Sequence, residues 1–349
     1  MAGTTVRRDF EEVACLLCDA KQERLLFELP DYNQGCPGLF RIVQCRNCDL
    51  VYLNPRPSQK VIHQYYPPEE WIRVKLKVSL EKGEISGKPW RQIMARRSSP
   101  ILSRRVRGRI LEIGSGDGLF LRHLMEKGWD CVGVEPDPEA SQYAREVCGV
   151  SVQTGSPDTI DFPPHSFDVT SLFAAIEHLP NPLETLKKLK GLIQEDGFIY
   201  IGSVPNFDSF DRRLFGKRWA HLNAPRHLYH FTPQTLNKVL ERIGLFSEAV
   251  GMQSSEGKTV MGYTDSLRYH LRDMGLPVGR KSRPGGISEE GGSGCWERIF
   301  SSKTKQTIHV LEYGIFRAIG QIADACQKGS VFSVIAKKRE GGFLKEERP

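Results

Sequence analysis

Four of the nine cysteines form two closely spaced pairs near the start of the chain. Cys15 and Cys18 make one C-x-x-C motif, and Cys45 and Cys48 make a second after 26 intervening residues. Each two-residue spacer allows a tight turn to direct both thiolates at one ion, and tetrahedral zinc takes four sulfur ligands at about 2.3 Å. In a reducing compartment this spacing predicts a zinc ribbon. Four thiolates leave no open coordination position, so the zinc is expected to stabilise the fold rather than to catalyse.

The alternatives for these cysteines are unpaired thiols and a thioredoxin-type redox pair. A redox pair would place one C-x-x-C motif at a strand-to-helix turn. Here the two motifs flank a hairpin-like stretch, LLFELP…LFRIVQC, which favours the zinc ribbon.

A second group of side chains that could do chemistry lies between residues 219 and 230. Three of the nine histidines, His221, His227 and His230, occur in this short segment. Histidine has an ordinary pKa near neutrality, so it can serve as a base toward an acceptor that must lose a proton. The alternative is that His227 and His230 pack or cap the chain ahead of Thr232, a candidate N-cap of the next helix.

A glycine-rich turn, GSGDG at residues 114–118, follows the apolar stretch RILEI and precedes a helical pattern. Glycines at such a turn let the backbone approach a ligand closely, because a Cβ would obstruct it. A dinucleotide-binding turn would have a third glycine where this chain has Leu119, so a pyrophosphate cofactor is disfavoured. Glu135 ends the next apolar stretch, where a carboxylate can accept both hydroxyls of a ribose; the alternative is a solvated loop acid.

Short apolar strands and amphipathic helices alternate through the centre of the chain. This alternation predicts an α/β fold with a doubly wound, mostly parallel seven-stranded sheet. The expected strands cover 109–113, 131–137, 150–155, 167–179, 198–206, 245–250 and 331–338.

Residues 109–250, about 40% of the chain, resemble a known family, the class I S-adenosylmethionine (SAM)-dependent methyltransferases. The resemblance rests on five short motifs that are specific only in combination. They are E-I-G-S-G-D-G (112–118), V-E-P-D (134–137), S-F-D-V (166–169), E-H-L-P-N-P (177–182) and S-V-P-N (203–206).

The resemblance implies a Rossmann-like methyltransferase core with SAM as the methyl donor. In this family the glycine turn lies against the methionine part of SAM, an acid matching Glu135 holds the ribose, and the loop matching 155–158 flanks the adenine. Acids at Glu112, Asp117 and Glu135 suit the cationic sulfur of SAM better than a diphosphate. The residues predicted to bind SAM are Glu112, Gly114, Ser115, Gly116, Gly118, Glu135, Pro136, Ser156 and Ala174.

The cysteine ribbon ahead of this core and the segment PRHLYHFTPQTL behind it resemble methyltransferases of nucleotide-sugar, polysaccharide and natural-product pathways. Sugar C-methyltransferases of this group carry E-H-F-x-x-F-S at the equivalent place, with the histidine as base. By this match His227 is the predicted catalytic base, and His230 and His221 are further candidates. Arg226 stands where that motif has glutamate, which fits an anionic acceptor.

Glu177 and His178 precede Asn181-Pro182, which opens the next predicted helix. We interpret the two residues as part of the start of that helix, since proline is favoured at its first position. The alternative is a catalytic pair.

The chain is expected to comprise six segments. They are a zinc ribbon at 10–55, a helical bridge or lid at 56–105, the SAM-binding core at 106–250, a helical insertion with a mobile Gly/Ser-rich loop at 251–330, the last core strand at 331–338 and a polar tail at 339–349.

The insertion is expected to contain a helix around 262–274 and a long amphipathic helix from Trp296 to about Cys326. An apolar stripe on the long helix predicts packing on the core or on a second copy of the chain in a homodimer. The alternative is an interfacial helix that makes a peripheral membrane contact and reaches a lipid-linked or quinone acceptor. The stripe consists of Ile308, Leu311, Ile315, Ile319 and Ile322.

The composition, with 39% hydrophobic and 26% charged residues over 349 positions, is that of a globular protein and excludes a wholly disordered or collagen-like chain. No apolar run approaches the roughly 20 residues of a membrane-spanning helix, and the N-terminus has no signal-peptide pattern, so a cytoplasmic location is expected. The net charge of +7 is spread over short clusters, which argues against a nucleic-acid partner.

The sequence therefore predicts a SAM-dependent methyltransferase that modifies oxygen or carbon of a small molecule, sugar or glycan. One alternative is an RNA base methyltransferase whose zinc ribbon binds nucleic acid, although the chain lacks the (N/D)-P-P-(Y/F) element of amino-group methylation. A second is methylation of a lipid-like or quinone acceptor at the membrane surface. A third is a non-catalytic binding protein, against which the intact glycine turn and Glu135 argue.

Overall fold

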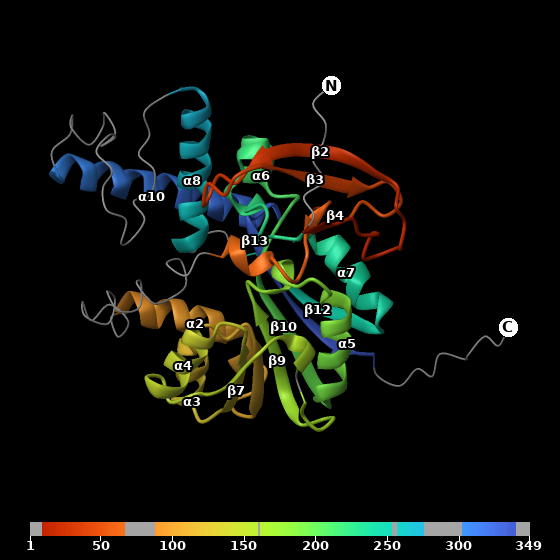
Figure 1. Cartoon of the computed structure of the whole chain (residues 1–349). Helices are drawn as coiled ribbons and strands as arrows, with labels where there is room; N and C mark the ends of the chain where they lie inside the picture. The colour runs from red at the N-terminus through yellow and green to blue at the C-terminus, as the bar shows by residue number, and fades with distance from the viewer. Residues whose placement is uncertain (1–8, 67–87, 160, 253–256, 276–301, 340–349) are drawn as a thin grey trace.

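The computed structural model describes residues 9–66, 88–159, 161–252, 257–275 and 302–339. Its main element is a seven-stranded sheet composed of β6 (Arg109–Ile113), β7 (Asp130–Glu135), β8 (Ser151–Thr154), β9 (Phe167–Phe173), β10 (Ile193–Pro205), β12 (Leu245–Met252) and β13 (Val331–Lys338). The strand order is β12-β13-β10-β9-β6-β7-β8 (Figure 1). Only β13 runs against its two neighbours, so the expected doubly wound, mostly parallel sheet is confirmed.

Helices cover both faces of this sheet (Figure 1). One group contains α2 (Lys88–Leu102), α3 (Leu119–Met125) and α4 (Pro138–Glu146), and the other contains α5 (Pro182–Leu192) and α7 (Pro233–Arg242). Neighbouring strand residues enter different cores, because successive side chains of a strand point to opposite faces. Ile110 packs with the first group of helices, whereas Leu111 packs with the second.

The strand order reverses at the centre of the sheet. From β6 the chain proceeds outward through β7 to β8, and it then returns to the other side of β6 to form β9 and β10. Loops after β6 and β9 therefore diverge at the carboxyl edge of the parallel strands, which is where open α/β sheets bind ligands.

β9 ends at Phe173, earlier than the strand expected over residues 167–179. Ala174 has a left-handed φ of +50°, which turns the chain out of the sheet. A short 3-10 turn, η4 (Ile176–His178), follows and leads into α5.

The cysteine-rich segment forms a second, four-stranded antiparallel sheet. It consists of β2 (Glu23–Pro30), β3 (Leu39–Cys45), β4 (Val51–Leu53) and β11 (Tyr229–His230), in the order β11-β4-β3-β2. β11 belongs to the histidine-rich segment, so the ribbon expected at 10–55 has its fourth strand from a distant part of the chain. Buried side chains of this sheet share one continuous core with α5 and α7.

The bridge expected at 56–105 has a mixed structure where it is described. β5 (Arg56–Pro57) pairs with β1 (Phe10–Glu11), a 3-10 turn η1 (Ile62–Tyr65) follows, and α2 ends the segment. Residues 67–87 of this segment lie outside the described part of the chain.

The insertion contributes two helices beside the small sheet, α8 (Gly257–Asp273) and α10 (Ser302–Ala325) (Figure 1). The orientation of α10 differs from the expected stripe. Phe316 stacks on Tyr263 of α8, whereas Ile315 and Ile322 are 58% and 67% exposed. The expected start of this helix at Trp296 and the Gly/Ser-rich loop lie outside the described residues. None of the described helices has the length and apolar composition needed to cross a bilayer.

Candidate active site

The glycine turn connects β6 to α3 at the carboxyl edge of the large sheet. Gly114, Gly116 and Gly118 all have φ between +55° and +73°, a region that favours glycine. Gly114 donates its backbone N–H to the carbonyl oxygen of Val134 at 2.8 Å. The turn is thus held against the end of β7, where Glu135 lies.

Glu135 is 2% exposed, and backbone groups fix both of its carboxylate oxygens. Gly116 donates its N–H to Oε2 at 2.8 Å, and Asp137 donates its N–H to Oε1 at 2.9 Å. Burial raises the pKa of Glu135, although these two hydrogen bonds act in the opposite direction. The carboxylate therefore ties the glycine turn to the loop after β7, and each oxygen keeps a second lone pair for a ligand.

Glu112 and Asp117 bring two further acids to the same place. Glu112 is 3% exposed, and burial raises its pKa well above the usual range; Arg97 lowers it, while Asp117 and Glu135 raise it. Among the described residues, Glu112 Oε2 and Ser115 Oγ are buried without a hydrogen-bond partner. A cationic ligand with hydrogen-bond donors would relieve both the charge repulsion and the unmet hydrogen bonds.

The other residues predicted to bind SAM lie on adjoining loops of this edge. Pro136 follows β7, Ser156 follows β8, and Ala174 follows β9, where it is exposed. The N–H of Gly155 donates to the carbonyl oxygen of Glu135 at 2.9 Å, so the loops after β7 and β8 are joined. The structure therefore brings all nine predicted positions to the ends of four neighbouring strands.

Gly118 also has a packing role that the sequence did not indicate. A Cβ at this position would lie 2.8 Å from the Cβ of Ala144 in α4. The absence of a side chain thus allows α3 and α4 to approach each other.

The predicted catalytic residue His227 lies beside His178, which the sequence analysis treated as part of a helix start. Their rings meet edge to face with centroids 4.5 Å apart. His178 Nδ1 lies 2.7 Å from the Tyr66 hydroxyl and 3.2 Å from the carbonyl oxygen of Arg226. Leu228 donates its N–H to the carbonyl oxygen of Glu177 at 2.8 Å, which joins the histidine segment to η4.

Burial keeps the histidines of this region neutral. It lowers the pKa of His178 to about 4 and that of His230 to about 3, and it lowers the pKa of His221 and His227 as well. A positive charge on His178, His230 or His221 would further disfavour protonation of His227. The predicted base and its two alternatives are therefore grouped, and all three are neutral imidazoles near pH 7.

His221 and His230 differ from His227 in their surroundings. The His221 ring packs edge-on against Trp219 with centroids 5.4 Å apart, and the His230 ring packs on Phe207 at 5.9 Å. Within the described part of the chain, neither ring nitrogen of His230 has a hydrogen-bond partner.

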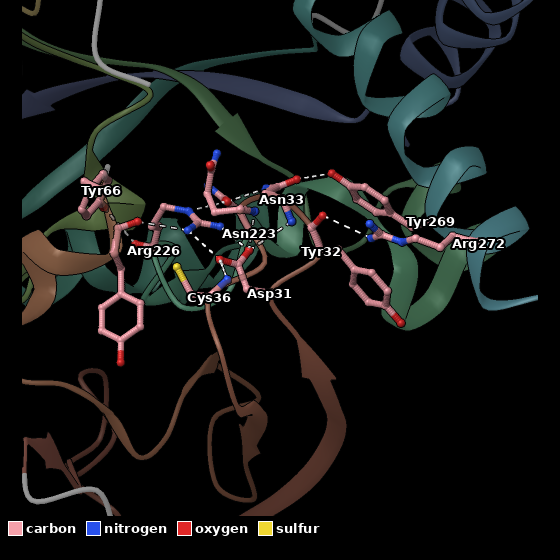
Figure 2. Close-up of polar contacts among 11 residues, drawn as sticks. Asp31, Tyr32, Asn33, Cys36, Tyr66, Asn223, Arg226, Tyr269 and Arg272 are labelled. Carbon is pink, nitrogen blue, oxygen red and sulfur yellow. Dashed lines mark hydrogen bonds and ion pairs between the residues drawn. The ribbon is translucent and has the colours of Figure 1, made fainter. Parts of the chain in front are cut away.

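Arg226 does not have the role that its position suggested. Its guanidinium is 3% exposed and pairs with Asp31, with Nη2–Oδ1 and Nη1–Oδ2 distances of 2.6 and 3.0 Å (Figure 2). It also donates to Asn223 Oδ1 at 2.9 Å and to the carbonyl oxygen of Tyr65 at 3.1 Å. The expectation that Arg226 binds an anionic acceptor is therefore wrong, because Asp31 already neutralises its charge.

Burial alone would raise the pKa of Asp31, but the hydrogen bonds and charge of Arg226 outweigh it and lower the pKa. The same hairpin end is tied to α8, since Asn33 accepts a hydrogen bond from Tyr269 and Arg272 donates to the carbonyl oxygen of Tyr32 (Figure 2). The segment 221–230, predicted to contact the acceptor and called the acceptor side below, is thus held by the ribbon hairpin, η1 and the insertion together.

A family model described as a methyltransferase domain matches residues 86–247, a segment that contains the glycine turn, Glu135 and His227. Residues 86–247 are a class I SAM-dependent methyltransferase domain.

Curated relatives match part of the chain. The ubiquinone biosynthesis O-methyltransferase of Aliivibrio fischeri (strain MJ11) is 24% identical over 149 residues, which are 39% of this chain and 63% of the relative. The uncharacterized methyltransferase YcgJ of Bacillus subtilis is 27% identical over 145 residues, which are 38% of this chain and 54% of the relative. The chain thus spans less than two thirds of the length of these relatives.

Solved structures with similarity to this chain include two methyltransferases. A SAM-dependent methyltransferase from Archaeoglobus fulgidus matches with a TM-score of 0.44 and 18% identity, over 74% of this chain and 98% of that chain. A putative sarcosine dimethylglycine methyltransferase from Galdieria sulphuraria matches with a TM-score of 0.44 and 13% identity, over 70% of this chain and 84% of that chain.

The four paired cysteines converge outside the methyltransferase domain. The Sγ atoms of Cys15 and Cys48 are 3.3 Å apart, and those of Cys18 and Cys45 are 3.5 Å apart. Four sulfurs around tetrahedral zinc would be separated by roughly 3.8 Å. The donor set and its spacing therefore fit a structural zinc ion.

Sequence reasoning missed two residues, Arg97 and Tyr66, which the structure places near Glu112 and near His178. Arg97 of α2 lies over the Phe173 ring at 4.1 Å and next to Glu112, and Tyr66 contacts His178. Arg97 had a weak signal, as part of a basic pair, whereas Tyr66 lies far from the histidine segment in sequence and had none.

Proposed function

We propose that the chain catalyses methyl transfer from SAM to an oxygen atom of a small-molecule acceptor. The observation that carries the proposal is the convergence of Glu112, Asp117 and Glu135 beside the glycine turn. A cationic nucleoside would stabilise the ionised forms of these acids, whose pKa values burial raises, whereas a diphosphate would oppose their ionisation.

Different residues of the chain would contact different parts of SAM. Glu135 would accept the ribose hydroxyls, the loop containing Ser156 would flank the adenine, and the turn at 114–118 would contact the methionine part. When bound, SAM supplies a methyl group attached to a cationic sulfur. The protein must then hold the acceptor in line with that methyl group, because a displacement of this kind depends mainly on orientation.

The histidine group at residues 221–230 supports the acceptor assignment. A neutral imidazole at His227 can accept the proton of a hydroxyl, and His178 and Tyr66 hold it in place. The curated relatives named ubiquinone biosynthesis O-methyltransferases also modify oxygen, as their names state. A phenol or a sugar hydroxyl is therefore the acceptor we expect.

An RNA acceptor is less well supported, because carboxylates already pair with several arginines that have another basic residue next to them in the sequence. Arg105 pairs with Asp168 at 2.9 Å and Arg213 pairs with Asp208 at 2.6 Å. Arg104 and Arg218 likewise pair with Glu248 and Asp273.

An apolar acceptor such as a quinone precursor is favoured by one specific observation, the exposed Ile315 and Ile322 on α10. These side chains give that helix an apolar outer surface that could contact a lipid layer. Flotation with phosphatidylcholine vesicles tests this variant of the proposal: binding that is lost in Ile315→Gln/Ile322→Gln supports it, and no binding of the unmodified chain contradicts it.

The ribbon is proposed to bind one structural zinc ion through Cys15, Cys18, Cys45 and Cys48. The ion would stabilise the small sheet, whose hairpin carries Asp31, the ion-pair partner of Arg226. It would therefore affect the reaction only by positioning the segment that contains Arg226 and His227.

The test of the proposed function is a search for methylated products with SAM labelled in its methyl group. Panels of phenols, sugars, nucleotide sugars and RNA are incubated with the full chain, with His227→Ala and with no protein. We expect label in a hydroxyl-bearing small molecule, and at least about tenfold slower transfer with His227→Ala at unchanged SAM affinity. Label in RNA alone, or equal rates for His227→Ala and the unmodified chain, would contradict the assignment.

A further inference from the structure

A second group of potential metal ligands lies at the acceptor side, apart from the cysteines. One donor atom from each of Glu177, His178 and His227 lies within 4.8 Å of the other two. Glu177 and His178 belong to η4, whereas His227 comes from the segment before β11. The backbone bond from Leu228 to Glu177 fixes these two segments to each other.

The hydrogen bonds of His227 determine which of its ring nitrogens can bind a ligand. Nδ1 lies 2.9 Å from the carbonyl oxygen of His221. A carbonyl oxygen can only accept, so Nδ1 carries the proton of the neutral ring and Nε2 carries the lone pair. Histidines that bind metals usually donate their other N–H to a carbonyl or carboxylate in this way.

His178 is held in a similar manner. A proton on its Nδ1 can be donated to the carbonyl oxygen of Arg226 at 3.2 Å or to the Tyr66 hydroxyl at 2.7 Å. In that tautomer Nε2 of His178 also presents a lone pair. The Arg226–Asp31 pair fixes the segment that supplies the carbonyl oxygen.

Glu177 supplies an independent observation that points to a ligand. Its side chain is 2% exposed, and Oε2 has no hydrogen-bond partner among the residues that the structure describes. A buried carboxylate oxygen without a partner is costly, and native proteins usually pair such a group or use it to coordinate a metal. A cation between Glu177 and the two imidazoles would meet this requirement.

We propose that Glu177, His178 and His227 bind a divalent first-row transition metal ion, at a site separate from the four cysteines. Two imidazoles and one carboxylate form a donor set that suits Zn²⁺, Mn²⁺, Fe²⁺ or Co²⁺, whereas four thiolates select zinc. Ligation by zinc would bring the donor atoms to roughly 3.3 Å from one another, from a present spacing of at most 4.8 Å.

The number of ligands indicates what such an ion does. Three protein ligands leave coordination positions open, as in metal sites that bind a substrate, whereas structural zinc sites are closed by four. The ion would therefore bind an oxygen-bearing acceptor, such as a phenol with a neighbouring hydroxyl or carbonyl oxygen. With the ion bound, Nε2 of His227 is a ligand and not a base, and the ion instead lowers the pKa of the acceptor hydroxyl. This role rests on the proposed function, but metal binding itself can be measured without it.

The experiment adds Co²⁺ to the full chain after its cysteine site has been loaded with zinc and weakly bound metal has been removed. We expect one Co²⁺ per chain in addition to the zinc, with visible absorption that lacks thiolate-to-metal charge transfer. Glu177→Gln and His178→Ala should each weaken Co²⁺ binding by more than about tenfold, since even loss of an outer partner of a metal ligand costs about that much. The control His270→Ala removes an exposed histidine of α8 and should leave binding unchanged.

Absence of Co²⁺ binding by the zinc-loaded, unmodified chain would overturn the inference, and this result needs no variant to fold. Equal Co²⁺ affinity of Glu177→Gln and the unmodified chain would also overturn it. SAM calorimetry on the same samples separates the two proposals: retained SAM affinity without a second metal contradicts only the metal site. A chain that binds Co²⁺ but not SAM contradicts only the proposed function.

Discussion

The cofactor edge and the acceptor side of the site are built in different ways. The cofactor edge uses the loops that directly follow β6, β7, β8 and β9, and every predicted residue lies within a few positions of a strand end. The acceptor side combines the ribbon hairpin at 31–36, η1, η4 and the segment 221–230. Sequence neighbours form the first, and buried contacts between distant segments form the second.

Because of this difference, we expect a substitution in one part to leave the function of the other part largely intact. Local turns and strand ends position the cofactor edge, so damage to the ribbon should affect it weakly. The acceptor side depends on one buried ion pair and on a sheet shared with the ribbon, so it should be lost when either is broken.

The largest expected effect comes from the cysteine cluster. Cys45→Ser removes one of four zinc ligands, and metal binding in small zinc modules contributes about 10 kcal/mol or more to folding. We expect loss of zinc and early proteolysis in residues 10–53 and 206–231, with a larger loss of methyl transfer than of SAM affinity. Metal analysis and limited proteolysis measure the outcome, with Cys326→Ser, an exposed cysteine of the described chain, as the control. Unchanged zinc content in Cys45→Ser would contradict the proposal that the four cysteines bind zinc.

Breaking the buried ion pair should have the next largest effect. Asp31→Ala leaves the Arg226 guanidinium buried without its partner, which should cost about 3–5 kcal/mol of unfolding free energy. Because the penalty comes from the uncompensated charge, the double variant Asp31→Ala/Arg226→Met should recover more than half of it. Urea unfolding measures both variants.

The matched control is Arg213→Ala, which breaks an exposed pair with Asp208 and should cost less than about 1 kcal/mol. If Asp31→Ala and Arg213→Ala destabilise the chain equally, the ion pair does not hold the acceptor side.

The smallest effect concerns the outer helix α10, which packs on α8 beside the acceptor side. Phe316→Ala should lower the unfolding free energy by about 1–2 kcal/mol, because Phe316 is half-buried on Tyr263. Ile322→Ala, at a residue that is 67% exposed, should change it by less than about 0.5 kcal/mol. Urea unfolding measures both variants. A larger loss of unfolding free energy in Ile322→Ala than in Phe316→Ala would show that Ile322 packs on the core.

The fold and the cofactor edge were predictable because local patterns determine them. Strands buried on both faces read as short apolar runs, and the positive φ of Gly116 restricts that position to glycine. Thr232 was likewise a good N-cap candidate, and it forms a capping box with Thr235 at the start of α7.

The acceptor side was less predictable because its contacts join residues far apart in sequence. Asp31 lies 195 positions before Arg226, and nothing near either residue signals the pair. Ile315 and Ile322 of the stripe on α10 do not pack on the core, because Phe316 beside them makes the contact with α8; packing on a second copy of the chain stays a prediction. Periodicity identifies an amphipathic helix but does not decide which neighbours it meets.

Calorimetric titration with SAM tests the central claim, that the donor binds at the carboxyl edge of β6 and β7. The unmodified chain should bind one SAM, and Gly116→Arg should bind it more than about 100-fold more weakly, which is about 2.7 kcal/mol. Gly128→Arg is the matched control, because Gly128 also has a positive φ but has open space around it. Full SAM affinity in Gly116→Arg, or no binding by the unmodified chain, would contradict the account.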